Sequence, residues 1–435
     1  MSPIYGNMVG GAILGTSLAD KPTLDEVNNT TKLIYNTLST TNAVYGFIER
    51  GDVLAPSQRI EYIEANKDYT PFSLNTDTGV MILNSWSGFD WLEQNRPAMV
   101  KSDGTVDYWL NENDYTLKQD GSASDVSNVE YDGNAMAWFP KIYKYEKQIG
   151  ADRIVKFSMS KLDGFEPIGF VDEEGKELSG VWGPIFYGWR DANGKMRSIA
   201  NGDIATHSLN TAQEWSAISA NGSRARFFGG AIMETLVDLM ILFAKTTDLQ
   251  TAYGKGNSSG YNSSDTTTYG KTANLATNCG QFYGTSDGKS INRVFHSMVL
   301  ITQNQYQRDP YLLVVKGRVK VSPNYKYDVS GDTYVDTGLN IPDIESSNWT
   351  YPNHRRVIPG FGSFPEPEPN KGSTSLGITD GVYRYSSASS FVAVVRRFCN
   401  CGLGSAGGPR ALGLGGSASN AYWSVGASLI LLPDK

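Results

Sequence analysis

The chain has 435 residues, of which 40% are hydrophobic and 19% charged, so it is globular and long enough for about two to four domains. The formal net charge of −7 at pH 7 argues against a nucleic-acid partner, since no basic surface is available to replace phosphate counterions. Three cysteines cannot form a disulfide framework, and the longest apolar helical run, 236–244, is too short to cross a bilayer. We therefore expect a chain that is made in a reducing cytoplasm and has no membrane insertion.

The first fifty residues predict two different segments. Residues 1–20 are Gly-rich and apolar without a helical or strand period, which is typical of a disordered leader or a docking peptide. Residues 21–51 have a side-chain spacing that alternates between three and four, which predicts an N-terminal coiled-coil helix from Pro22 to Gly51. An amphipathic helix on a globular core is the alternative. The seam that would oligomerise the chain consists of Leu24, Val27, Thr31, Ile34, Leu38, Thr41, Tyr45 and Ile48.

Residues 52–133 predict a small β-rich connector. Short runs that favour strands, at 59–64, 79–83, 106–110 and 115–117, are separated by turn signals such as Asp-Gly. We expect these strands to form a platform between the N-terminal helix and the larger domain that follows.

From residue 134 to residue 435 the pattern indicates one large α+β domain. A capping-box sequence at 211–214 predicts a helix with Ile218 on its buried side. The run 233–245 is apolar nearly all round, which predicts a buried helix. Because the helices lie early and most strands lie late, we expect the two kinds of element to segregate. Strand-like runs occur at 136–145, 154–159, 297–301, 311–321, 391–395 and 425–432.

The C-terminal tract, residues 381–433, has an unusual composition. It contains no Asp or Glu, and its segment 402–416 holds seven glycines in fifteen residues. Glycine-rich segments are often flexible linkers, but this one ends in a hydrophobic strand and is therefore expected to fold. Loops that present small, aromatic and amide side chains on a rigid sheet are typical of recognition surfaces.

Several stretches of the chain together resemble a known fold family. They are the strand Trp138–Lys141, the helix 239–245, and a C-terminal pattern that runs from Arg396-Arg397 to 419–427. The layout resembles the C-type-lectin-like fold, shared with formylglycine-generating enzymes, as it occurs in bacteriophage tail and fibre proteins and above all in variable proteins that retroelements diversify. In that family Arg-Gly-Gly precedes the variable loops, whereas Phe398-Cys399 follows the arginines here.

The resemblance implies a homo-oligomeric virion protein, expected to be a trimer, that serves as a tail fibre or tail tip. It would attach to a protein or glycan on the host bacterial surface through loops of the C-terminal tract, and residues 1–20 would dock to other virion proteins. It implies no catalytic residue and neither a metal nor another cofactor. The residues expected to contact the ligand are Phe398, Asn400, Cys401, Leu403, Ser405, Pro409, Arg410, Asn420, Tyr422 and Ser424.

Two other functions stay open from the residues alone. The many Asp and Glu side chains allow a carboxylate pair for glycan cleavage, so a virion-associated polysaccharide depolymerase is one alternative. A structural head-fibre or collar decoration is the other. Thiol catalysis by Cys399 and Cys401 is disfavoured, because alternate residues of a strand point to opposite faces. The acid repeat Asp328, Asp332 and Asp336 is interpreted as a hairpin turn in preference to a calcium loop.

Overall fold

The computed structural model describes residues 43–200, 205–258, 279–287, 292–301, 305–368 and 371–434. From Val44 onward the chain forms one compact unit. The structure is 34% strand and 13% helix, so it is mostly β, and the expected α+β class with its lectin-like domain is wrong. The longest described helix, Ala231–Ala244, has 14 residues, and no helix among the described residues is long and apolar enough to cross a membrane.

The coiled-coil helix predicted for residues 21–51 is wrong at its C-terminal end. Tyr45 and Ile48, two of its expected seam positions, lie in strand β1 (Val44–Glu49), which pairs with another strand on each side. The aromatic and β-branched side chains of this run favour an extended backbone, and pairing on both edges outweighs the weak heptad. The leader 1–20 and the seam positions from Leu24 to Thr41 lie outside the described residues.

The first sheet is antiparallel and brings the start of the described chain into the core. Its strand order is β2-β1-β10-β9, so β1 lies inside the sheet and pairs with β10, far along the chain. Phe47 of β1 is fully buried, as an inner strand requires. Helix α2 (Pro56–Arg59) leads directly into the edge strand. The other strands are β2 (Ile60–Glu64), β9 (Tyr143–Ile149) and β10 (Asp152–Ser158).

The second sheet crosses the boundary that the sequence predicts at residue 134. Strand β5, from the expected connector, pairs with β8 from Pro97↔Ala137 to Val100↔Asn134. Residues 52–133 therefore share a sheet with residues 134–435 and do not form a separate connector. The strand order is β14-β27-β11-β8-β5-β6-β7. Its strands are β5 (Pro97–Val100), β6 (Val106–Asn111), β7 (Asp114–Lys118), β8 (Asn134–Pro140), β11 (Gly180–Pro184), β14 (Ala225–Phe227) and β27 (Leu429–Leu431).

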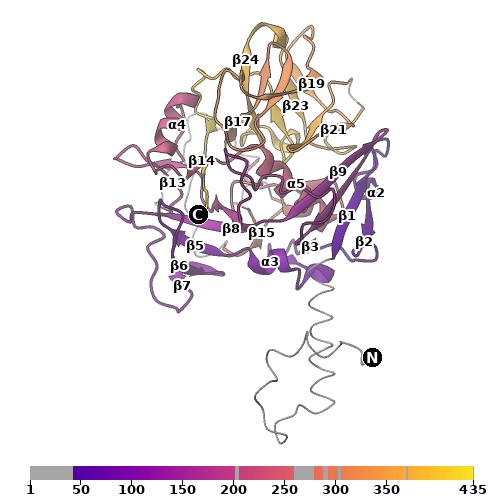
Figure 1. Cartoon of the computed structure of the whole chain (residues 1–435). Helices are drawn as coiled ribbons and strands as arrows, with labels where there is room; N and C mark the ends of the chain where they lie inside the picture. The colour runs from indigo at the N-terminus through magenta and orange to yellow at the C-terminus, as the bar shows by residue number, and fades with distance from the viewer. Residues whose placement is uncertain are drawn as a thin grey trace, which may run out of the picture. The chain divides into compact units, whose positions relative to one another are not determined.

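The third sheet is built from the later part of the chain and occupies the upper part of Figure 1, in orange to yellow. Its order is β19-β18-β17-β24-β25-β23-β20, and β26 pairs with β17 in parallel. Three of its inner strands, β24, β25 and β23, come from the C-terminal tract. The strands are β17 (Tyr306–Val315), β18 (Arg318–Val321), β19 (Val335–Asn340), β20 (Asn348–Thr350), β23 (Val382–Arg384), β24 (Val392–Arg397), β25 (Leu412–Gly413) and β26 (Val425–Gly426).

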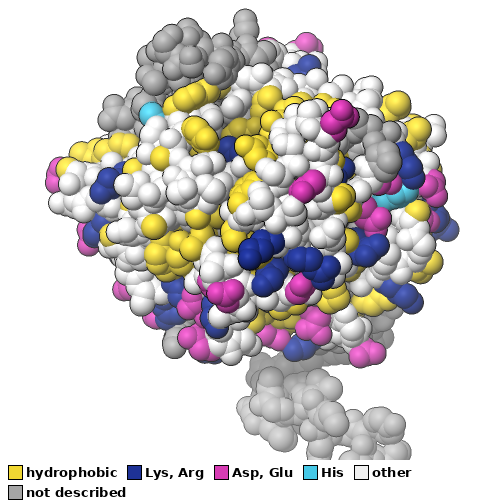
Figure 2. All heavy atoms as spheres, turned by 90° about the horizontal axis from the view of Figure 1, so that it is seen from above, with side chains coloured by type: hydrophobic (Ala, Val, Ile, Leu, Met, Phe, Trp, Pro, Cys, Tyr) yellow, Lys and Arg dark blue, Asp and Glu magenta, His cyan; other side chains and the backbone are white. Residues whose placement is uncertain are grey.

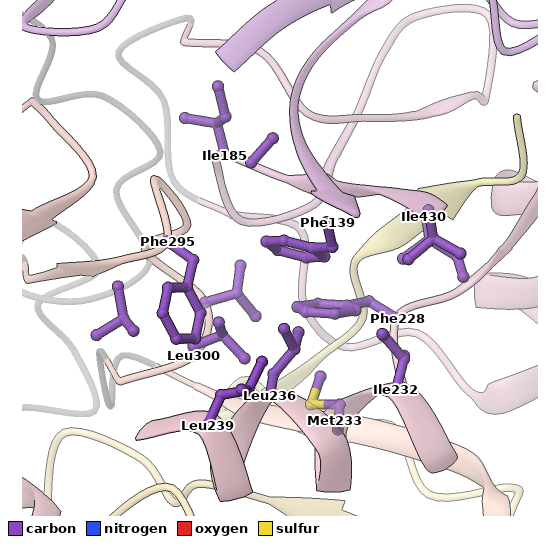
Figure 3. Close-up of a cluster of buried hydrophobic side chains, with 14 of the residues drawn as sticks. Phe139, Ile185, Phe228, Ile232, Met233, Leu236, Leu239, Phe295, Leu300 and Ile430 are labelled. Carbon is purple, nitrogen blue, oxygen red and sulfur yellow. The ribbon is translucent and has the colours of Figure 1, made fainter. Parts of the chain in front are cut away.

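Helix α5 (Ala231–Ala244) lies in the centre of the fold, and all of its residues are buried, as its apolar sequence predicts. Its side chains Ile232 and Leu236 point toward Phe139 of β8 and toward Phe228 (Figure 3). The rings of Phe139 and Phe228 stack with their centroids 6.1 Å apart. Each large apolar side chain contributes roughly 1.5–3 kcal/mol on burial, so this cluster fixes α5 against the second sheet.

Short elements join the sheets. Helix α4 (Thr211–Ser219) begins with a capping box, formed by Asn210 and Gln213, one residue before the predicted position. The run 297–301, predicted as a strand, contains an isolated bridge and turns instead. The remaining elements are α3 (Asp90–Gln94), α6 (Leu249–Tyr253), η2 (Asn84–Trp86), η3 (Ala388–Ser390), η4 (Gly404–Ala406), and the paired strands β3 (Ser73–Leu74) with β4 (Met81–Ile82), β12 (Trp189–Arg190) with β13 (Met196–Arg197), β15 (Phe282–Tyr283) with β16 (Arg293–Val294), and β21 (Arg355–Ile358) with β22 (Gly362–Pro365).

Candidate functional site

Half of the residues expected to contact a ligand are buried, so the display-loop prediction is wrong for them. Phe398 belongs to the main hydrophobic core, because the chain turns inward after β24 with positive φ angles of 75° at Phe398 and 104° at Cys399. A side chain without access to solvent cannot contact an external ligand. The buried residues of this group are Phe398, Cys401, Pro409, Arg410 and Ser424.

Three further expected contacts lie on a separate turn at η4. Ser405 is exposed there, whereas Asn400 and Leu403 are half-buried. The Asn400 side-chain oxygen accepts a hydrogen bond from the backbone of Gly402 at 2.9 Å, and Gly404 donates to the Ser258 carbonyl at 3.1 Å. The first bond is internal to the turn, the second joins the turn to a residue much earlier in the chain, and none of the three expected contacts lines the pocket described below.

Buried ion pairs tie the C-terminal tract to helix α5. Glu234 and Asp238 lie one helical turn apart on α5, and both are buried. Glu234 accepts from Arg397 at 2.6 Å and from Arg355 at 2.9 Å. Asp238 accepts from Arg153 of β10 at 2.6 Å. A helix that is apolar on its other faces thus carries two carboxylates on the face that meets the tract.

Glu49 continues this buried network into strand β1. It contacts Arg410 at 2.7 Å, Arg153 at 3.0 Å and Arg59 at 3.2 Å. Burial alone would raise the pKa of Glu49, but the three arginines together hold that pKa well below its usual range. Arg410 is therefore part of the internal structure and not of a binding surface.

Arg396 and Arg397 are neighbours in β24 with opposite environments. Consecutive strand residues point to opposite faces of a sheet. Arg397 points inward, where it pairs with Glu234 and with Asp309 at 2.5 Å. Arg396 points to the other face, lies over the ring of Tyr306 with 5.2 Å between the guanidinium carbon and the ring centroid, and has a buried Nε without a hydrogen-bond partner.

The outer face of β23, β24 and β25 carries a pocket of about 410 Å³ around Arg396. Register places Arg396 opposite Gly413, and Gly413 beside Tyr383, so the three positions form a row across the sheet. Tyr422 and Tyr385 are 50% and 36% exposed, and both contribute to the pocket wall. The lining residues are Tyr383, Tyr385, Phe391, Arg396, Gly415, Ser417, Asn420 and Tyr422.

Two consecutive glycines make room for the principal side chains of the pocket. A Cβ on Gly415 would lie 2.6 Å from the Tyr385 ring. A Cβ on Gly416 would lie 2.8 Å from Nε and 3.1 Å from Cζ of Arg396. Because real Cβ atoms do not approach other atoms so closely, the glycines allow the ring and the guanidinium to lie flat against the backbone.

The loop that carries Asn420 and Tyr422 is fixed from behind. Ser417 donates to the Asn420 side-chain oxygen at 2.8 Å. Arg308 of β17 donates to the Asn420 carbonyl at 3.0 Å, and Ser208 donates to the Tyr422 carbonyl at 3.0 Å. These contacts hold the loop so that the Tyr422 ring stays at the surface.

The pocket therefore unites only two of the ten expected contacts, Asn420 and Tyr422. Sequence reasoning missed Arg396, Tyr383 and Tyr385. The alternation of side chains along a strand could have identified them. It places Arg396 and Arg397 on opposite faces of β24, and it places Tyr383 and Tyr385 on the same face at β23. Figure 2 shows the molecule from above, where a group of Lys and Arg side chains lies just below the centre of the face and further charged side chains lie toward its edge.

The other sequence motifs have structural roles. The carboxylate of Asp328 accepts hydrogen bonds from Ser330 and Thr333, which closes the predicted hairpin turn. Across the described ranges no three His, Cys, Asp or Glu side chains are grouped so that they could hold a metal ion. No protein-family model matches the chain, and no curated protein matches its sequence.

Proposed function

We propose that this protein is a bacteriophage virion protein, a tail fibre or tail tip, that binds a ligand on the surface of the host bacterium and performs no catalysis. The observation that carries the proposal is the pocket in which Tyr385, Tyr422 and Asn420 surround Arg396. Tyrosine offers a large contact area at a low cost in conformational entropy, and the amide adds adaptable hydrogen bonds, which is the chemistry of recognition surfaces.

A rigid support makes the pocket suited to binding. Its three strands are inner strands of the third sheet, and its loop is held by Arg308 and Ser208. Side chains that are already ordered lose less entropy when a ligand binds. We propose that several copies act together, as a homotrimer attached to other virion proteins, because linked weak sites bind a surface far more tightly than one site does.

The exposure of each side chain also decides where sequence variation is tolerated. We propose that retroelement diversification, if related genes carry it, changes Asn400, Leu403, Ser405, Asn420 and Tyr422 and spares the buried ion pair of Arg410. The varied codons would be identified by comparing the gene with a neighbouring repeat of its 3′ end, because the two sequences would differ at positions where the repeat has adenine. Differences concentrated on the buried positions would contradict this part of the proposal.

A cell-binding experiment tests the main proposal. The full chain is labelled with a fluorophore and incubated with a panel of bacterial strains, and bound fluorescence is measured for each strain. We expect strain-specific binding that Tyr422→Ala reduces about 10-fold, since one central aromatic contact is typically worth more than 1 kcal/mol. The matched control is Ile149→Ala, because Ile149 is 54% exposed and lies outside the pocket. Equal binding to every strain, or equal loss in both variants, would contradict the proposal.

A further inference from the structure

The charge of the pocket is positive and is not balanced from within. Arg396 alone is charged among the residues that line it. The buried Arg397 and Arg410 of the same tract each have a carboxylate partner, whereas Arg396 has an aromatic contact with Tyr306 and, among the described residues, no ion pair with a carboxylate. Because Nε is buried against Gly416, a ligand would meet the terminal nitrogens of the guanidinium, and an anionic ligand would balance its positive charge there.

The shape of the guanidinium indicates which acceptor fits. Arginine presents a planar fork of N–H groups that matches the two oxygens of a carboxylate. Gly416 leaves room for the guanidinium directly beside the backbone, which restricts its movement. Hydrogen bonds to such a preordered charged donor are about twice as strong as those between neutral groups.

The rest of the pocket favours a saccharide over a peptide. Strand β25 has a partner on each side, β24 and β23, so no free strand edge is available here for a peptide to extend the sheet. A ligand in this pocket therefore does not bind by extending the sheet. The exposed rings of Tyr385 and Tyr422 offer apolar faces, and Asn420 and Ser417 offer an amide and a hydroxyl, a combination that suits the C–H faces and hydroxyl groups of a sugar.

We infer that the pocket binds an acidic sugar of a bacterial surface saccharide, with the sugar carboxylate on Arg396 and the sugar ring against Tyr385 and Tyr422. This inference rests on the proposed function for its biological setting, because it assigns the chemical class of ligand that the same pocket would take.

A glycan array of matched pairs tests the inference. Saccharides that contain uronic or sialic acids are printed beside their carboxyl-reduced, neutral forms and beside acidic peptides, and the full labelled chain is applied. We expect each bound acidic saccharide to bind about 10-fold to 100-fold more tightly than its reduced form. Arg396→Gln is expected to abolish this preference, and Arg396→Lys to restore part of it, because lysine keeps the charge and lacks the fork.

Two glycine variants provide a test that leaves Arg396 in place. Gly416→Ala displaces the guanidinium and is expected to weaken acidic binding about 10-fold. Gly413→Ala is the matched control, because its Cβ would lie 3.6 Å from the nearest atom of Arg396, an ordinary contact. Thermal unfolding of every variant shows whether it is folded. If Arg396→Gln does not fold, the comparison of Gly416→Ala with Gly413→Ala still tests the inference.

The possible outcomes separate the inference from the proposed function. Equal binding to acidic and reduced saccharides, binding to peptides alone, or no saccharide binding at all would overturn the inference. Binding to bacterial cells that survives Arg396→Gln unchanged would also overturn it, while leaving the proposed function intact. Arg396-dependent binding to acidic saccharides without binding to any bacterial strain would support the inference and contradict the proposed function.

Discussion

The backbone N–H of Arg410 donates to Oδ2 of Asp380 at 2.6 Å, while Oδ1 of the same carboxyl group has no hydrogen-bond partner. Asp380 is only 2% exposed. Burial raises the pKa of Asp380 to about 8, although the neighbouring Arg410 opposes this change. The carboxyl group therefore keeps its proton in the folded protein at neutral pH and loses it in the unfolded chain.

Asp380→Asn should make stability less dependent on pH. The folded pKa lies above the unfolded value of 3.8, so the contribution of Asp380 to stability is complete below about pH 4 and is lost as pH rises toward about 8. Asparagine resembles the protonated acid and does not titrate. We expect the free energy of unfolding of the variant, relative to the native chain, to increase between pH 5 and pH 8 by on the order of 1 kcal/mol or more. Urea unfolding of both proteins at pH 5 and pH 8 measures this change. Free energies of unfolding that depend on pH in the same way in both proteins would contradict the prediction.

Glu49→Gln should destabilise the fold strongly. It leaves Arg59, Arg153 and Arg410 around a neutral amide, and breaking a buried ion pair on one side costs about 3–5 kcal/mol. The control is Glu61→Gln on the neighbouring strand β2, where the ion pair with Arg50 is exposed to solvent and should be worth no more than about 1 kcal/mol. Chemical unfolding of both variants checks the difference. Similar losses of unfolding free energy in the two variants would show that the buried ion-pair network contributes little to stability.

Gly169→Ala should cost more stability than Gly175→Ala. Both glycines have positive φ, 86° and 82°, so the backbone strain from a side chain is the same and amounts to about 1–2 kcal/mol. A Cβ on Gly169 would also lie 2.6 Å from the Cα of Ile232 in helix α5, whereas a Cβ on Gly175 meets nothing within 4 Å. We expect an additional loss of about 1–3 kcal/mol for Gly169→Ala, measured by thermal or urea unfolding. Equal losses would mean that α5 moves away freely.

His296 should make the protein sensitive to mild acid. It is 1% exposed, with Nδ1 2.8 Å from the Tyr115 hydroxyl and Nε2 3.2 Å from the Asn95 carbonyl. Nε2 therefore carries the proton and donates to the carbonyl, while Nδ1 accepts from the hydroxyl. Burial, assisted by the positive charge of Arg293, lowers the pKa of His296 to about 3.

The lowered pKa of His296 changes stability with pH in the opposite direction to the raised pKa of Asp380. The folded pKa lies below the unfolded value of 6.5, so the unfolded chain binds the extra proton and stability falls as pH drops below about 6.5. We expect His296 to contribute a loss of about 2 kcal/mol between pH 7 and pH 5. In His296→Gln that part of the pH dependence should vanish, whatever the stability of the variant at pH 7. An unchanged slope would contradict the assignment.

Sequence patterns within one segment correctly predicted several helices and strands. The apolar run 233–245 predicted a buried helix, which is confirmed as α5, and the runs 106–110 and 115–117 are confirmed as β6 and β7. The heptad failed at Tyr45 and Ile48, because pairing with β10 on one side and β2 on the other decides the conformation of that run. Such pairing is not encoded in the spacing of one segment.

The candidate site was predicted only in part for the same reason. Tyr422 is exposed and Asn420 is half-buried, and both line the pocket. Arg410 was expected to face a ligand, yet its partner Glu49 lies 361 residues away in sequence. Exposure in this tract depends on distant carboxylates, which the composition of the tract itself does not reveal.

The position of β27 has a consequence for synthesis of the chain. It follows every other described strand in sequence, yet it lies between β14 and β11 and pairs with both. Until residues 429–431 have left the ribosome, the edges of β14 and β11 that face β27 in the second sheet have no strand to pair with. Nascent chains therefore remain prone to wrong edge pairing until a late stage of translation, and a stop codon shortly before Leu429 would yield a product for degradation.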